Sequence, residues 1–156
     1  MRKYLIFFLV SLMILGGCAA QSSPPPAPQQ FNATAQVQLG EHEFAAQVQQ
    51  LRPGALAWTY TSPAEIAGLQ LQLQGDIVTL RDGELSTEVP VDSLPGSNMV
   101  VLLNGVLLRL AQENAADFTL TGTTNGFDYT AELSPQGELI GLNIPALNME
   151  VTLLHS

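Results

Sequence analysis

Few side chains in this 156-residue sequence have types and spacings that could do chemistry. The only histidines, His42 and His155, fall in an expected turn and at the C-terminal end. Because zinc sites take three or four protein ligands, we expect no metal site. The sequence has no glycine-rich phosphate loop and no G-x-S-x-G or H-E-x-x-H motif, so we expect no cofactor and no enzymatic activity. Four carboxylates could meet across strands as a catalytic pair, although a solvated acidic face is the simpler interpretation: Asp76, Asp82, Glu84 and Glu88.

The one cysteine, Cys18, directly follows Leu15-Gly16-Gly17. Upstream lie a basic start and an apolar run over 4–15, which is shorter than the roughly 20 residues of a membrane-spanning helix. This pattern resembles the signal peptide and lipobox of bacterial lipoproteins. The resemblance implies a signal peptide over 1–17, cleavage before Cys18, and lipid attachment to its sulfur with palmitate-type chains. We expect a protein held by this anchor on the extracytoplasmic face of the cell membrane, with a simple N-terminal membrane span as the weaker alternative.

Residues 18–30 comprise the lipidated cysteine and a Pro-, Gln- and Ser-rich tether. Such a segment has too little apolar surface to fold and favours extended polyproline II, at about 3.1 Å per residue. Residues 31–156 then form one domain. The formal net charge is −9, with only five Lys and Arg in total. This balance argues against nucleic acid as a partner and against broad electrostatic attachment to anionic lipid.

Apolar and polar residues alternate through most of the domain, which predicts strands with one buried face. Turn signals recur every eight to twelve residues, including Asp82-Gly83 and Asn125-Gly126, and Ser62 to Glu65 has the pattern of a capped helical turn. The fold class is therefore mainly β: one antiparallel sheet of about ten strands, which must curl. We expect strands over 31–39, 44–52, 56–60, 69–74, 77–81, 84–89, 118–124, 127–133, 139–143 and 149–154.

The most apolar stretch after the tether, Met99 to Ala111, permits two interpretations. Asn104-Gly105 between two apolar runs is typical of a hairpin. The runs do not alternate, however, and at 100° per residue most of their apolar side chains share one broad face. We therefore favour a helix capped by Ser97. Three apolar side chains still fall on its polar side: Val101, Leu102 and Leu108.

A lipobox, a tether and a curling sheet interrupted by one apolar helix resemble the Lol-type lipoprotein carrier and receptor family. That family includes LolA, LolB and germination and sporulation lipoproteins of clostridia. The local similarity lies in Tyr60, Pro63 and Gly68-Leu69. The resemblance implies a half-barrel over residues 31–156, with the helix across its concave face as a lid. It also implies a hydrophobic space between them that receives acyl chains.

Two functions from different classes follow. In the first, the half-barrel binds or carries a lipid or acyl chain. In the second, its core is filled and the tethered lipoprotein acts as an assembly factor for a protein partner. Aromatic and leucine side chains on the inner faces fit either a packed core or a ligand pocket. The candidate pocket residues are Trp58, Tyr60, Leu71, Leu103, Leu107, Phe127 and Tyr129.

The anchor can be tested by substituting its cysteine. Two or more acyl chains on one residue give stable membrane attachment, whereas one gives only marginal binding. We expect Cys18→Ser to release the protein from membranes, measured by fractionation after a high-salt wash. A serine variant that had lost its signal peptide and still remained in the membrane fraction would contradict the lipid anchor.

Overall fold

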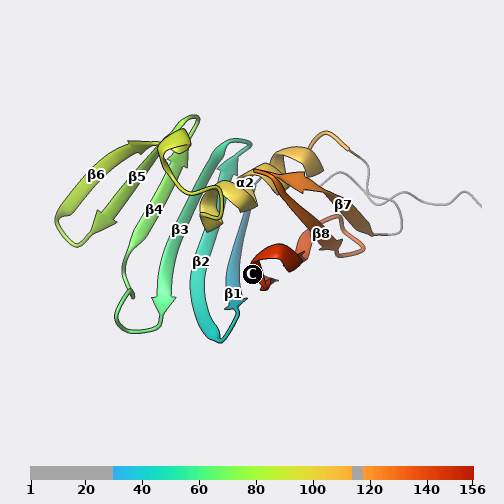
Figure 1. Cartoon of the computed structure of the whole chain (residues 1–156), viewed down its shortest axis with the longest axis horizontal. Coiled ribbons are helices and arrows are strands. Elements are labelled where there is room, and N and C mark those ends of the chain that lie inside the picture. The colour runs from blue at the N-terminus through green and yellow to red at the C-terminus, as the bar shows by residue number, and fades with distance from the viewer. Residues whose placement is uncertain (1–29, 114–117) are drawn as a thin grey trace, which may run out of the picture.

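The structure is a computed structural model that describes residues 30–113 and 118–156 (Figure 1). The lipobox, Cys18 and most of the tether lie outside the described residues, so the predictions made for them remain predictions. Within the described residues the chain forms ten strands, two short 3-10 turns and one α-helix. No helix among these residues combines the length and apolar character needed to cross a membrane.

The strands fall in two runs, one before and one after helix α2, which spans Met99–Leu110. The first run comprises β1 (Phe31–Leu39), β2 (His42–Arg52), β3 (Ala55–Ser62), β4 (Gln70–Gln74), β5 (Ile77–Asp82) and β6 (Leu85–Pro90), followed by the 3-10 turn η1 (Val91–Ser93). The second comprises β7 (Thr119–Thr124), β8 (Phe127–Leu133), β9 (Leu139–Ile144), the 3-10 turn η2 (Pro145–Leu147) and β10 (Met149–His155).

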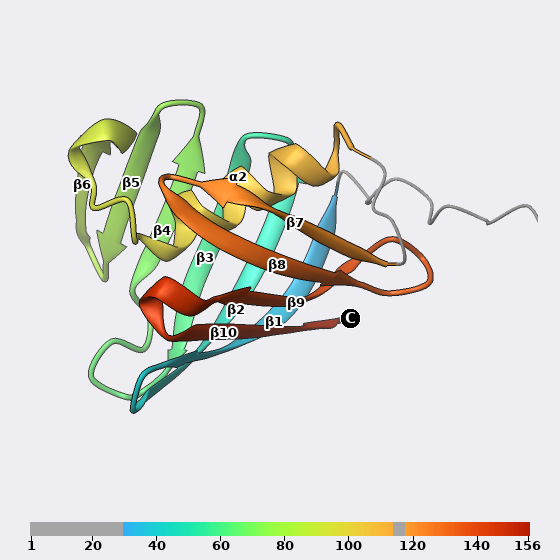
Figure 2. The same cartoon turned by 45° about the vertical axis from the view of Figure 1, so that its right-hand side comes forward.

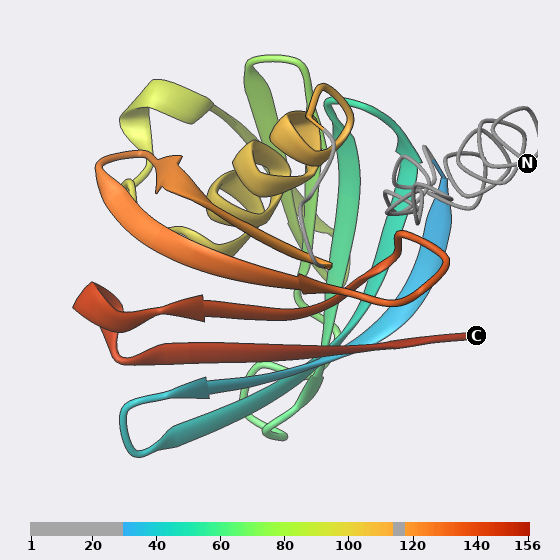
Figure 3. The same cartoon turned by 90° about the vertical axis from the view of Figure 1, so that its right-hand side faces the viewer.

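All ten strands belong to one antiparallel sheet in the order β6-β5-β4-β3-β2-β1-β10-β9-β8-β7. The first strand pairs with the last, with Val37 opposite Val151, so two meanders join at the middle of the sheet. The sheet curls into a half-barrel whose two edge regions lie on either side of α2 (Figures 2 and 3). The predicted fold class is confirmed: a mainly β protein with one curled sheet and one helix on its concave face.

Alternation along the strands separates an apolar concave face from a polar convex face. Small alanines occupy the concave face where the meanders join, and Ala33, Ala35 and Ala46 are at most 1% exposed. Glutamines and threonines occupy the convex face, where Gln47 Nε2 donates to Thr34 Oγ1 across the β1–β2 pair at 3.1 Å. Small side chains at the bend leave room for larger ones from both wings and from α2, which favours dense packing.

Helix α2 has the expected amphipathic character, but its cap is one residue later than predicted. Asn98, not Ser97, is the N-cap, and its side-chain oxygen accepts from the Val100 and Val101 N–H groups at 3.1 and 3.4 Å. Asparagine caps as well as serine because both present an oxygen to the unpaired first-turn donors. The buried face contains Met99, Val100, Leu102, Leu103, Val106, Leu107 and Leu110.

Two local predictions in the first meander were wrong. The two-residue loop of the β5–β6 hairpin is Gly83-Glu84 rather than Asp82-Gly83, because Asp82 pairs with Leu85 and Gly83 takes the positive φ of 58°. Ser62 ends β3 instead of capping a helical turn. The following residues form consecutive turns in which Ile66 N donates to Pro63 O and Leu69 N donates to Ile66 O. In contrast, Asn125-Gly126 forms the predicted hairpin loop.

Gly105 explains why glycine occurs within the helix. A Cβ atom at this position would overlap Oγ1 of Thr124, which is buried on β7. The backbone of α2 therefore approaches β7 more closely than any residue with a side chain would allow. The Asn104-Gly105 pair that imitates a hairpin loop belongs instead to this helix–strand contact.

Gly105→Ala should lower the free energy of unfolding by about 1–3 kcal/mol, the usual cost of overpacking. This result would be diagnostic because Gly→Ala within an unobstructed helix stabilises by about 1 kcal/mol. Thr124→Ala in the same chain should restore part of the loss, since it removes the overlapping oxygen. Urea denaturation of the wild type and the two variants measures both effects, and a stabilised single variant would contradict the close contact.

Candidate functional site

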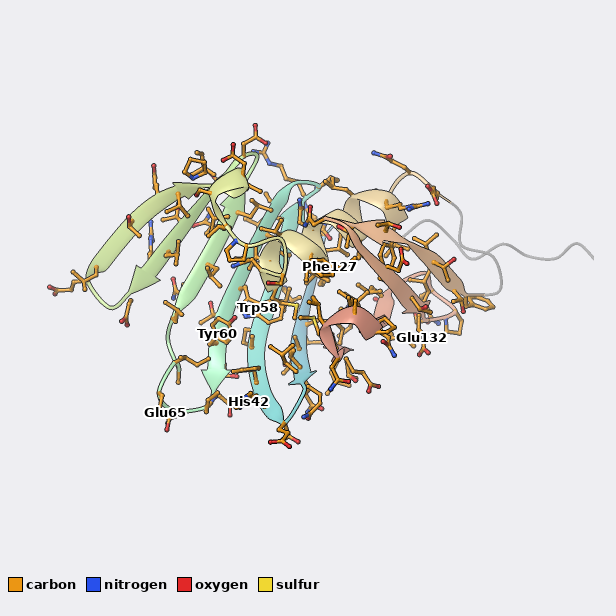
Figure 4. The ribbon with its side chains drawn as sticks, viewed as in Figure 1. His42, Trp58, Tyr60, Glu65, Phe127 and Glu132 are labelled. Atoms are coloured by element: carbon orange, nitrogen blue, oxygen red, sulfur yellow. The ribbon has the colours of Figure 1, made fainter. Side chains whose placement is uncertain are left out.

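The seven residues expected to line a pocket lie on both wings of the half-barrel and on the helix between them. Five are buried, with Trp58 only 1% exposed, while Tyr60 and Phe127 are half-buried. Trp58 faces Leu71 across the β3–β4 pair, and its ring centroid lies 5.9 Å from that of Tyr60. Figure 4 shows Trp58 and Tyr60 on β3 and Phe127 on the opposite wing. The structure thus brings the set into one core cluster.

Side chains fill the space around this cluster. Of the seven residues, only Tyr129 borders one of the main surface depressions, and that depression lies on the outer side of β7 and β8. Leu102, which the sequence placed on the polar side of the helix, is fully buried. The buried side chains beneath α2 form one cluster, and Tyr60 and Phe127 pack against it. A ligand role for the seven residues remains a prediction.

Three buried polar atoms in this interior have no hydrogen-bond partner of good geometry among the described residues: Gln50 Oε1, Trp58 Nε1 and the Tyr129 hydroxyl. Burial raises the pKa of the Tyr60 phenol, and the neighbouring Trp58 indole opposes that shift. The indole acts here through proximity, because its N–H does not meet hydrogen-bond geometry. Buried polar groups without a hydrogen-bond partner are uncommon in native proteins. These three atoms are therefore exceptions within the core.

Arg109 approaches the sheet, although the helix pattern places it on the polar face. A Cβ atom at Gly122 would collide with the Arg109 guanidinium and the Tyr129 hydroxyl, so all three groups meet over β7 and β8. Arg109 Nε also pairs with Glu113 Oε1 at 3.0 Å. Burial raises the pKa of Tyr129, while the Arg109 charge opposes the shift. Because Gly122 lacks a side chain, the guanidinium can lie against the strand. Sequence reasoning missed this contact.

An open apolar groove lies at one lip of the half-barrel, where the linker from β6 to α2 crosses toward the β7–β8 turn. Its volume is about 710 Å³. The half-exposed Val101 of α2 forms part of its lining, which explains one of the apolar side chains left on the polar side of the helix. The apolar lining residues are Ile77, Pro90, Val91, Leu94 and Val101. We call this surface the lip groove.

A second depression of about 390 Å³ continues the concave face beyond the helix, at the β5–β6 hairpin. Leu69, Leu80 and Leu85 contribute its apolar side chains, and Leu85 is 75% exposed. Helix α2 therefore covers the centre of the concave face and leaves apolar surface open at its margins. Neither depression was predicted from the sequence. The sequence held one signal for the lip groove. Val91 and Leu94 are apolar residues in the segment between β6 and α2, which lies outside the strands and the helix.

The residues considered for metal or acid–base chemistry do not come together. His155 Nε2 lies 2.6 Å from the Leu139 carbonyl, while the His42 ring lies 6.4 Å from that of Phe44. In residues 30–113 and 118–156, no three His, Cys, Asp or Glu side chains gather as metal ligands. The β5–β6 register places Asp82 opposite Leu85 and Glu88 opposite Thr79, so these strands do not align two carboxylates.

The fold and the site define an open antiparallel half-barrel with an apolar helix across its concave face and an apolar groove at its lip. Among solved structures, the chain is similar to a LolA superfamily protein from Nitrosomonas europaea. The identity is 13%, the alignment covers 85% of each chain, and the TM-score is 0.42. No protein-family model matches the sequence, and no curated protein matches it.

The packed interior and the open lip predict different costs for truncating two residues of one helix. Leu103→Ala should lower the free energy of unfolding by about 2–5 kcal/mol, because Leu103 is fully buried among packed side chains. Val101→Ala should cost less than about 1 kcal/mol, because Val101 is half-exposed at the groove. Urea denaturation compares the two variants, and equal losses would contradict the assignment of Val101 to an open surface.

Proposed function

We propose that the half-barrel binds a lipid or acyl chain, and that the protein performs this role as a non-enzymatic, membrane-anchored lipoprotein on the extracytoplasmic face. The observation that carries the proposal is the lip groove, which Val101 of α2 lines together with four apolar residues of the sheet and linker. Ligand sites are typically mostly apolar and occupy about 300–1,000 Å³. The groove volume of about 710 Å³ falls in this range.

The chemistry of the groove favours a chain of substantial length. Each methylene removed from water contributes about 0.8 kcal/mol, while association costs at least about 4 kcal/mol in lost translational and rotational freedom. A chain of about ten carbons would gain about 8 kcal/mol if fully buried and less in a groove open on one side. Short apolar molecules would therefore bind weakly, and long-chain lipids are the favoured class.

Helix α2 would also determine how deeply such a chain enters. Its inner face packs against both wings, so a chain that replaced these contacts would have to offer comparable apolar area. A ligand shifts a conformational equilibrium only by its difference in affinity for the two states. The lip groove offers a chain its first contacts without moving the helix, and deeper entry would follow as the chain took over contacts with Leu102 and Leu103.

A second candidate function has an observation in its favour. The interior around Trp58 and Leu103 is filled, as expected of a tethered lipoprotein that acts through a protein partner and carries no ligand. In that case the lip groove would be part of a protein interface. The two functions differ in whether the isolated protein takes up a small apolar molecule.

Val101→Gln provides the test, with Leu108→Gln as the matched control. Both residues are half-exposed apolar positions on α2, and Leu108 borders none of the main depressions. We expect the wild-type protein to bind the uncharged dye N-phenyl-1-naphthylamine and to release it to dodecanol. Val101→Gln should weaken binding about four- to tenfold, the equivalent of roughly one to two methylenes, while Leu108→Gln should not.

Native mass spectrometry of the bacterially produced protein provides a second readout, because retained lipid adds a discrete mass. Absence of both dye binding and retained lipid in the folded wild-type protein would overturn the lipid-binding function and leave the tethered-partner function. Equal weakening by both variants would show that binding does not occur in the lip groove.

A further inference from the structure

The lip groove has an acidic rim. Asp76, from the β4–β5 turn, and Asp92, from η1, join Asn125 of the β7–β8 turn as its polar lining residues. Both aspartates are exposed, and neither forms an ion pair with a described residue. No basic side chain lines the groove. The apolar floor thus ends at two carboxylates that form no ion pair with a described residue.

The backbone holds Asp76 and Asp92 near one hydrogen-bonded junction. Val91 N donates to the Asp76 carbonyl at 2.9 Å, which ties η1 to the β4–β5 turn, and Leu94 N donates to Val91 O at 3.1 Å, which closes η1. Ile77 and Pro90, the next residues inward, pair across β5 and β6. The carboxylates therefore flank one hydrogen-bonded junction, directly beside the apolar lining.

None of the basic side chains among the described residues forms an ion pair with Asp76 or Asp92. Arg81 lies four residues along β5 from Ile77, about 13 Å at the rise of a strand. Arg109 lies eight residues along α2 from Val101, about 12 Å at the rise of a helix, and pairs with Glu113. Arg52, the last residue of β2, is exposed and forms no ion pair with Asp76. The turn after it lies beside the β4–β5 turn, where Gly75 N donates to Gly54 O at 3.0 Å.

We propose that the occupant of the lip groove is a cationic amphiphile, an alkyl chain that ends in a protonated amine. This inference rests on the lipid-binding function and specifies the charge of the ligand. The chain covers the five apolar lining residues, and the ammonium lies at the rim near Asp76 and Asp92. An anionic head group would meet two like charges and the overall formal charge of −9. A neutral head group would gain nothing from the rim.

Three probes with the same twelve-carbon chain separate chain binding from head-group recognition: dodecylammonium, dodecanol and dodecanoate. The two charged probes are titrated below their micelle concentrations and dodecanol below its solubility limit. Each is added to the full-length protein carrying bound N-phenyl-1-naphthylamine, and dye release is followed. We expect affinity to fall in the order ammonium, alcohol, carboxylate. The preference for ammonium over alcohol should decrease as salt increases, because salt screens exposed charge pairs.

Asp76→Asn and Asp92→Asn should each reduce the preference for dodecylammonium over dodecanol about two- to fivefold, the range of a solvent-exposed ion pair. Dodecanol affinity should be unchanged, which shows that each variant keeps its groove. Glu84→Gln is the matched control, because it removes one negative charge at the far end of the β5–β6 hairpin. It should leave the preference intact.

Three results would overturn the proposal in distinguishable ways. If all three probes bind equally, or dodecanoate binds best, the cationic ligand is wrong while lipid binding stands. If no probe binds, lipid binding itself fails and the cationic ligand with it. A preference that falls equally in Glu84→Gln and in the two aspartate variants would reflect the net charge of the protein, and it would also exclude a specific role for the rim.

Discussion

The structure depends on covering one side of an open sheet. A sheet of ten strands presents a broad apolar concave face, and exposing it to water would be costly at about 25 cal/mol per Å². The chain covers this face with α2, the connection between the two edge strands, β6 and β7. Because the connection crosses the opening of the half-barrel, the same twelve residues link the wings and fill the space between them.

Two glycines allow α2 to pack closely against the sheet, one through the helix backbone and the other through an arginine side chain. Gly105 brings the helix backbone against Thr124 of β7, and Gly122 accommodates the Arg109 guanidinium on the same strand. At the other wing the helix packs by side-chain contact within a core that includes Trp58 and Leu71. The β7 side is therefore fixed by backbone approach, whereas the β3 and β4 side is fixed by side-chain shape, which adjusts more readily through rotamer changes.

Sequence reasoning located the ten strands, the helix and most of its buried face, because hydrophobic period and turn residues are local signals. It could not pair β1 with β10, since residues such as Val37 and Val151 are remote in sequence and nothing local links them. It placed the cap at Ser97 because serine and asparagine are equally suitable there. The lip groove was missed because three segments build it, and the Arg109 contact because it requires a glycine on another strand.

The neighbouring residues Val101 and Leu102 show how one helix can both close the core and leave apolar surface exposed. Successive positions on a helix are rotated by about 100°, so Leu102 faces the core and is fully buried, whereas Val101 faces the lip groove. A valine at that position has no partner in the core, and its apolar surface remains available. Because the same helix supports both residues, a chain bound beside Val101 would lie at the boundary of the packed interior, where small movements of α2 would determine how far it could enter.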